Sequence, residues 1–275
     1  MNDANKTVDQ LTFADDGMFQ EVLKEPAICA ELVERLLGIR IRRVEYPELE
    51  KVIEPFYTTK GVRLDVYLRD EDKVIDVELQ SYAQKELGKR MRYYEAMLDM
   101  DALMKGEPYN KLKESYVLFI CKYDPFMDKN QKPFGLPRYT FKNICAENNS
   151  VNLNDKSLKV VYNSSAYEAE KDDKVKAFLR FVQNNEPGAD DFSNRLNALV
   201  QKIKENEKFR REYAAMNLHD YDIICRGREE GAQAKAVEAA KNFAANGVPV
   251  EIIAKSLNMT VEQINDIVNN NVSEL

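Results

Sequence analysis

The sequence predicts an α/β domain followed by a helical C-terminal region. Apolar residues recur at helical spacing before, between and after several short runs rich in β-branched and aromatic residues. From about residue 166 onward only the helical spacing continues. Helices interspersed with strands are typical of a domain in which helices cover a sheet. We therefore expect an α/β domain at residues 1–188 and a helical region at residues 189–275.

The N-terminal half supplies the first helices and strands. Residues 16–37 have helical spacing, and Pro26 is expected to divide them into two helices because proline lacks the backbone N–H. A short strand is expected within residues 41–58, followed by a hairpin at 61–80. The spacing of apolar residues then predicts a helix over 84–104.

Three further strands are expected before the helical region. The continuous apolar run "SYVLFICKY", residues 115–123, suits a strand that is buried on both faces. Three prolines and a glycine mark residues 124–138 as a loop. Residues 139–145 and 157–163 are strand-like. After the last predicted strand, helices are expected over the ranges 167–185, 192–203, 220–245 and, as a pair, 249–270.

Composition places the chain among soluble globular proteins, with 44% hydrophobic and 32% charged residues. No apolar run reaches the length of a membrane span, so no membrane partner is expected. The N-terminal residues "MNDANKTVDQ" lack a basic start followed by an apolar block, and the 4 cysteines are scattered. We therefore expect a cytoplasmic protein with reduced thiols.

The sequence lacks the residues that several kinds of catalysis require. The only histidine is His219, and no cysteine pair has metal-ligand spacing, which argues against a zinc site or a Ser/His triad. Neither glycine-rich nucleotide-binding motif occurs. Any hydrolysis is therefore expected to depend on carboxylates, together with a hard metal ion.

The hairpin segment "GVRLDVYLRDEDKVIDVELQ" carries charges inside both of its apolar runs. Alternate residues of a strand share a face, and a turn centred on residues 70–73 places Asp65 opposite Glu78. Opposed residues point the same way, with Cβ atoms ~4.5–5.5 Å apart. Asp65 and Glu78 are therefore expected to meet on one face, beside Gln80.

Two opposed carboxylates repel each other unless a cation offsets their charge. Mg²⁺ prefers one or two carboxylates together with water and phosphate oxygens, so the pair suits phosphodiester hydrolysis. The same alternation also fits the solvated polar face of an ordinary amphipathic hairpin. Asp76, which shares the face without an assigned role, is compatible with that alternative.

Asp65, twelve further residues and then Glu78-Leu79-Gln80 form a pattern that resembles the PD-(D/E)XK nuclease superfamily. The resemblance is closest to its recombination-promoting nuclease (Rpn) branch, also described as PD-(D/E)XK family transposases. It runs from about residue 11 to about residue 230. Segments that resemble the branch, in its order, include "LTFADDGMF", "TTKGVRLDVYL", "GKRMRYYEAMLD" and "LKESYVLFICKYDPF".

The resemblance implies a restriction-endonuclease-like mixed central sheet flanked by helices. It also implies a metal-dependent DNA endonuclease associated with recombination or mobile elements. Asp65 and Glu78 would hold Mg²⁺, or alternatively Mn²⁺, and Gln80 stands where the wider superfamily usually has lysine. A neutral Gln80 can orient water but supplies no charge. The first helix often lends an acidic residue to the metal in this superfamily, and Asp16 or Glu21 is the candidate here. Asp16 is equally well explained as a helix cap.

A replacement for the missing positive charge is expected on the helix after the hairpin. Arg90 shares a helix face with Tyr94, and we interpret Arg90 as the replacing cation. Lys89 and Arg90 are candidates for phosphate contacts, and Lys60 and Arg63 for further contacts to the DNA backbone. An ordinary solvated basic face is the alternative.

The last two predicted helices have the rhythm of a helix-turn-helix, with Asn258 and Thr260 as caps between them. The second helix offers Glu262 and Asp266, a poor match to phosphate, so a helical hairpin or a homo-oligomer contact is favoured over DNA reading. For the whole protein, the alternative to a nuclease is a non-catalytic DNA-binding or protein-interaction module on a decayed nuclease scaffold.

Overall fold

A computed structural model describes residues 6–42, 48–53, 62–83 and 85–269, with only the backbone described at 49, 50, 216–230 and 269. The chain divides into two compact units, one spanning Lys6–Arg210 and the other containing Arg211–Leu275. The first unit therefore extends past the boundary predicted after residue 188, and a domain boundary at that residue stays a prediction.

The first unit is built around a mixed sheet of 6 strands in the order β1-β2-β3-β4-β6-β5. The first three strands form an antiparallel meander, β3, β4 and β6 are parallel, and β5 is an antiparallel edge strand. The strands are β1 Glu48–Ile53, β2 Val62–Arg69, β3 Lys73–Gln80, β4 Glu114–Cys121, β5 Arg138–Phe141 and β6 Ser157–Asn163. The predicted α/β fold with a mixed central sheet is confirmed.

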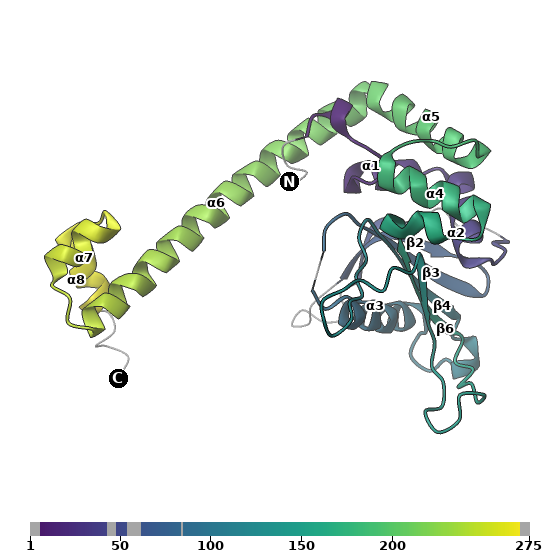
Figure 1. Ribbon diagram of the computed structural model, residues 1–275, viewed down its shortest axis with the longest axis horizontal. Coiled ribbons are helices and arrows are strands. Elements are labelled where there is room, and N and C mark those ends of the chain that lie inside the picture. Colours follow the sequence, from purple (N-terminus) through teal and green to yellow (C-terminus); the bar gives the residue numbers. More distant parts are fainter. Residues whose placement is uncertain (1–5, 43–47, 54–61, 84, 270–275) are drawn as a thin grey trace. The chain divides into compact units, whose positions relative to one another are not determined.

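Helices cover both faces of this sheet. Leu87 and Met91 of α3 pack in one core cluster with Phe119 of β4. Tyr162, whose neighbour Val161 belongs to that cluster, points to the opposite face, where its hydroxyl donates to Leu36 O of α2 at 2.7 Å. In Figure 1 the strands lie between α3 and the group formed by α1, α2, α4 and α5. These helices are α1 Asp16–Leu23, α2 Pro26–Leu37, α3 Leu87–Ala102, α4 Asp173–Asn184 and α5 Asp191–Glu205.

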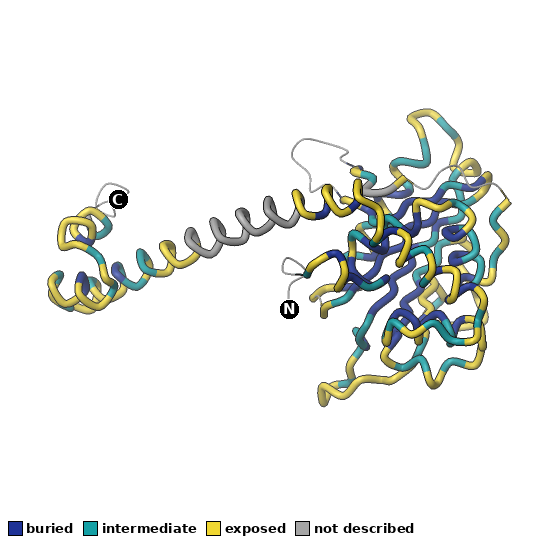
Figure 2. The backbone as a smooth tube through the Cα atoms, turned by 90° about the horizontal axis from the view of Figure 1, so that it is seen from above, coloured by how far each residue is buried: buried dark blue, intermediate teal, exposed yellow. Residues whose placement is uncertain are grey.

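The buried residues follow the strands and the inner faces of these helices (Figure 2). Pro26 occupies the start of α2 and so separates it from α1, as predicted. The helix predicted over 167–185 begins later, because residues Ser164–Ala169 form a 3₁₀-helix and Asp172 caps α4. The strand predicted over 139–145 ends at Phe141.

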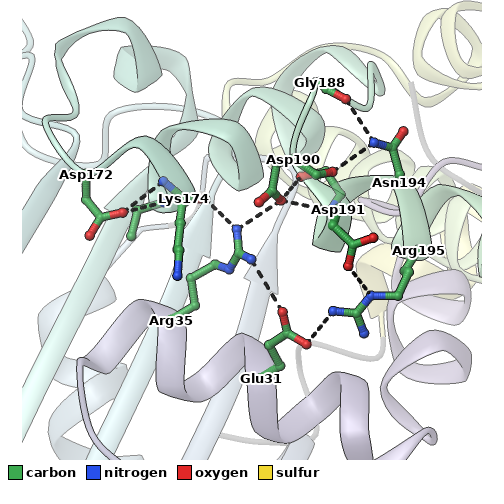
Figure 3. Close-up of polar contacts among 11 residues, drawn as sticks. Glu31, Arg35, Asp172, Lys174, Gly188, Asp190, Asp191, Asn194 and Arg195 are labelled. Carbon is green, nitrogen blue, oxygen red and sulfur yellow. Dashed lines mark hydrogen bonds and ion pairs between the residues drawn. The ribbon is translucent and has the colours of Figure 1, made fainter.

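A network of ion pairs joins α2 to the helices α4 and α5 (Figure 3). The guanidinium of Arg35 donates to Lys174 O at 2.9 Å and to Asp190 Oδ2 at 3.0 Å. It also lies over the ring of Phe192, 4.5 Å from the ring centre. The side chain of Arg35 is only 8% exposed, so these contacts are shielded from water.

The second unit contains two short helices, α7 Val250–Leu257 and α8 Val261–Asn269, after the long helix α6 Glu207–Ala245. Ile253 of α7 and Ile264 of α8 pack with Ala240 near the end of α6. The predicted caps are confirmed: Asn258 is left-handed, and the Thr260 hydroxyl accepts from Gln263 N at 3.1 Å. In the described part of the chain, no helix is long and apolar enough to cross a membrane.

We expect Arg35→Ala to lower the free energy of unfolding by about 2–3 kcal/mol, because it removes charge-assisted hydrogen bonds that link three helices. Urea denaturation would measure this change. Arg195→Ala is the matched control: Arg195 pairs with Glu31 in the same network, but its side chain is 44% exposed. That substitution is expected to cost less than about 1 kcal/mol, and an equal loss for both variants would contradict the importance of burial.

Candidate active site

The pairing of β2 with β3 follows the predicted register as far as Val66 and Val77, one position before Asp65 and Glu78. At the position of the two acids, hydrogen bonds of their side chains connect the strands. Asp65 N donates to Glu78 Oε1 at 2.9 Å, and Leu79 N donates to Asp65 Oδ2 at 3.3 Å. Each carboxylate is thus fixed by the backbone of the other strand.

The acidic face of β3 is buried. Asp76, Glu78 and Gln80 are only 0%, 2% and 6% exposed. The alternative interpretation of a solvated polar face is therefore wrong for this strand. Burial of carboxylates is costly unless a donor or a cation compensates it, which makes this strand a candidate for a binding or catalytic role.

Strict alternation, which the sequence predicts for β2, does not hold along the whole strand. Leu64 pairs with Lys51, whose Nζ contacts Asp101 Oδ2 of α3 at 2.7 Å. The hydroxyl of Tyr67, three residues after Leu64, also donates to Asp101, at 3.3 Å. The side chains of Leu64 and Tyr67, three positions apart, therefore both face α3. The alternation of β2 is thus broken between these two residues, in the segment that contains Asp65.

The carboxyl groups at this end of the hairpin resist ionisation. Burial, followed by the negative charge of Asp16, raises the pKa of Asp65 to about 6. Burial and the charges of Asp76 and Asp65 raise the pKa of Glu78 well above its usual range. Burial and the charge of Asp65 do the same to the pKa of Asp76. A cation at this position would offset all three effects.

Arg90 of α3 reaches this cluster. Its Nη1 donates to Gln80 Oε1 at 2.9 Å, and its Nη2 lies 3.9 Å from Glu78 Oε2. Nη2 also contacts the hydroxyl of Tyr94 at 3.2 Å, and the guanidinium lies 5.5 Å from the ring centre of Phe119. Arg90, which shares a helix face with Tyr94, thus brings a positive charge to Gln80 and Glu78.

Local backbone features position the starts of α1 and α3 near the carboxylates of Asp65 and Glu78. The Ser81 hydroxyl donates to Ala14 O at 2.5 Å and so ties the end of β3 to the start of α1, which begins at Asp16. On the other side, Glu86 has a left-handed backbone, with φ 62°, immediately before α3. Glu21, the other acidic candidate of α1, instead pairs with Lys24.

A cavity of about 550 Å³ opens beside Arg90. Two tyrosines and four cations dominate its lining, which consists of Val62, Arg63, Lys89, Arg90, Arg92, Tyr93 and Tyr94. Three of the four cations predicted to contact DNA, namely Arg63, Lys89 and Arg90, therefore gather at one place. Lys60 lies outside the described residues.

The donor set suits a hard divalent cation. Among the described residues none donates a hydrogen bond to Oδ1 of Asp65, and both oxygens of Asp76 are buried without a donor. Within the described ranges no group of three or more acidic, histidine or cysteine side chains is arranged to hold a metal. Mg²⁺ needs only one or two carboxylates and takes its other ligands from water and phosphate, so Asp65 and Glu78 fit it.

Residues 18–143 match the family described as PD-(D/E)XK nuclease family transposase. This segment is therefore similar to PD-(D/E)XK nucleases. The match includes β2, β3 and α3, and therefore the whole cluster around Asp65 and Glu78. A comparison with curated proteins and one with solved structures found no match.

The family assignment and the geometry together extend the set of site residues. Asp76 lies at the centre of the buried acidic face, and Arg92 and Tyr93 line the cationic cavity. The sequence did contain a signal for Asp76, since it shares a strand face with Glu78 and Gln80. No signal of this kind distinguished Tyr93, because only the packed helix shows which of its sides borders the cavity.

We expect the contribution of Asp65 to the stability of the metal-free protein to fall as the pH rises from about 4 to about 6. In this range folded Asp65, with its pKa raised from 3.8 to about 6, holds more protons than the unfolded chain. Asp65→Asn should therefore raise the free energy of unfolding above that range by roughly 1–3 kcal/mol and change it little below. Thermal melts in EDTA across this pH range would measure the difference.

The matched control for this measurement is Glu71→Gln, in the exposed turn of the same hairpin. It should leave the dependence of stability on pH unchanged. A rise in stability with pH that is equal for the parent and for Asp65→Asn would contradict the raised pKa of Asp65.

Proposed function

We propose that this protein is a metal-dependent DNA endonuclease that hydrolyses phosphodiester bonds. The observation that carries the proposal is the buried pair Asp65 and Glu78, each fixed by the opposite strand, beside a guanidinium bound to Gln80. The match of residues 18–143 to a PD-(D/E)XK nuclease family supports hydrolysis of nucleic acid. The family's description as a transposase supports an association with recombination or mobile elements.

Asp65 and Glu78 would hold the metal through their carboxylate oxygens. When bound, Mg²⁺ or Mn²⁺ would lower the pKa of a water molecule and neutralise charge on the scissile phosphate. Gln80 holds Arg90 through its Oε1, and Arg90 faces Glu78. Arg90 would therefore supply the positive charge that stabilises the phosphate in the transition state, in place of a lysine at position 80.

The cations of the cavity would bind the DNA backbone. Arg63, Lys89 and Arg92 line the same cavity as Arg90, which places four positive charges next to the acidic cluster. Such contacts fix a duplex in position without reading its sequence, and they weaken as salt concentration rises. We extend this role to Lys60 on the basis of sequence alone. A cytoplasmic location and homo-oligomer formation through the C-terminal helices also stay predictions.

Supercoiled plasmid should be nicked by the parent protein with Mg²⁺ or Mn²⁺ and not with EDTA. Asp65→Ala and Glu78→Ala should show no detectable cleavage, because each removes a metal ligand. Arg90→Ala should lower the rate by about 10²–10³-fold, the usual cost of one electrostatic donor. Glu71→Ala, in the exposed turn, is the matched control and should cleave as the parent does. Cleavage that persists in both Asp65→Ala and Glu78→Ala would contradict the proposed site.

A charge-exchange series would test the role of Arg90 directly. Gln80→Lys alone should not raise activity, because the new ammonium would face the guanidinium that now donates to Gln80. Combining Gln80→Lys with Arg90→Gln moves the cation from α3 to β3. The double variant should cleave at least about tenfold faster than Arg90→Gln alone, since the two positions are coupled. Equal rates for these two variants would contradict the replacement of lysine by Arg90.

The neutral Gln80 favours one other function, a non-catalytic DNA-binding module on the same scaffold. The burial of Asp65 and Glu78 argues against it, because a module without metal chemistry gains nothing from carboxylates that resist ionisation. The nicking experiment separates the two functions. Binding of DNA by all variants without cleavage by any of them would select the module.

A further inference from the structure

The loop between β4 and β5 presents apolar side chains to solvent. Met127, Phe134 and Leu136 are 50%, 61% and 52% exposed. A single exposed apolar residue needs no explanation, but three within ten positions of one loop form a surface that water does not favour. The loop does not lie flat on the sheet. A cavity of about 710 Å³ separates Met127 and Pro133 of the loop from residues such as Ala83 and Ala166.

The loop is held in one conformation by Asp124, which is 7% exposed. Its carboxylate accepts hydrogen bonds from Phe126 N at 3.0 Å, from Gly135 N at 2.7 Å and from the hydroxyl of Tyr139 at 2.8 Å. Gly135 has φ +73°, a conformation that a side chain would strain. Phe134 is therefore presented on a fixed backbone and loses little freedom when it contacts a partner.

Positive charges surround the apolar side chains. Residues 122–138, "KYDPFMDKNQKPFGLPR", contain four cations, Lys122, Lys129, Lys132 and Arg138, and two acids. Both acids are already engaged: Asp124 fixes the loop, and Asp128 Oδ1 accepts from Asn130 N and Lys132 N. The loop thus combines apolar side chains with a net positive charge, which is complementary to the phosphates of a polyanion such as DNA.

The loop also starts next to the proposed active site. Lys122 N donates to Gln80 O at 3.0 Å, so the chain leaves β4 directly beside the residue that holds Arg90. Tyr123 packs against the same core cluster as Tyr94. A duplex whose phosphate reaches Arg90 would therefore extend past this loop.

We propose that the loop of residues 122–138 distorts the DNA substrate by inserting Phe134 between adjacent bases while its lysines hold the backbone. The proposal rests on DNA being the substrate of the proposed nuclease. Apolar side chains that enter a base step unstack it and kink the duplex, and nearby cations offset the cost.

The experiment measures stacking in the absence of metal, so that cleavage does not interfere. Short duplexes that carry 2-aminopurine at successive positions are mixed with the full-length protein in EDTA, and fluorescence and anisotropy are recorded together. We expect the parent to raise the fluorescence of at least one duplex. Phe134→Ala should bind about tenfold more weakly and lose the rise, whereas Phe134→Leu should retain it. Tyr109→Ala is the matched control, because Tyr109 is 86% exposed and precedes the opposite end of β4.

Each outcome decides the proposal. Loss of the signal in Phe134→Ala, but not in Tyr109→Ala, supports it. DNA binding with no change in fluorescence, an equal signal in Phe134→Ala, or no DNA binding at all overturns it. Self-association that Phe134→Ala abolishes, without a stacking signal, assigns the loop to a second copy and also overturns it. Unstacking without nicking contradicts only the proposed hydrolysis, whereas nicking without unstacking contradicts only the wedge.

Discussion

The structure of the site depends on one electrostatic constraint, the burial of carboxylates at the end of the β2–β3 hairpin. Asp65 and Glu78 are fixed by backbone N–H groups of the opposite strand, and Asp76 is buried beside them without a donor. Such groups are stable in one place only if they stay protonated or meet a cation. Arg90 of α3 supplies part of that positive charge, and a bound cation would supply the rest.

This constraint explains why the site is assembled from distant segments. Pairing with β2 and β4 closes both edges of β3, so a cation reaches its acidic face from α3, which packs above the sheet. The left-handed backbone at Glu86 sets the direction of α3, and Arg90 follows on its first turn. Strain at this position is typical of functional sites, where packing holds a conformation that local preferences disfavour.

The two faces of the sheet have different tasks. On one face α2, α4 and α5 are joined by buried ion pairs centred on Arg35, which fix the scaffold. On the other face the polar groups of α3 point to Gln80 and Glu78 and border an open cavity. The ion pairs around Arg35 and the candidate site thus lie on opposite faces of the sheet, so substitutions in one network need not disturb the other.

The sequence by itself determined the hairpin register, because a period of two and a short turn leave Asp65 only one partner. It also determined the α/β class and the helix stripe that carries Arg90. Only the tertiary structure decided that the acidic face is buried, since β4 and α3 come from outside the hairpin and no local pattern shows what covers a strand. The break in alternation at Asp65 and the role of Asp76 were hidden for the same reason: both depend on contacts between residues far apart in the chain.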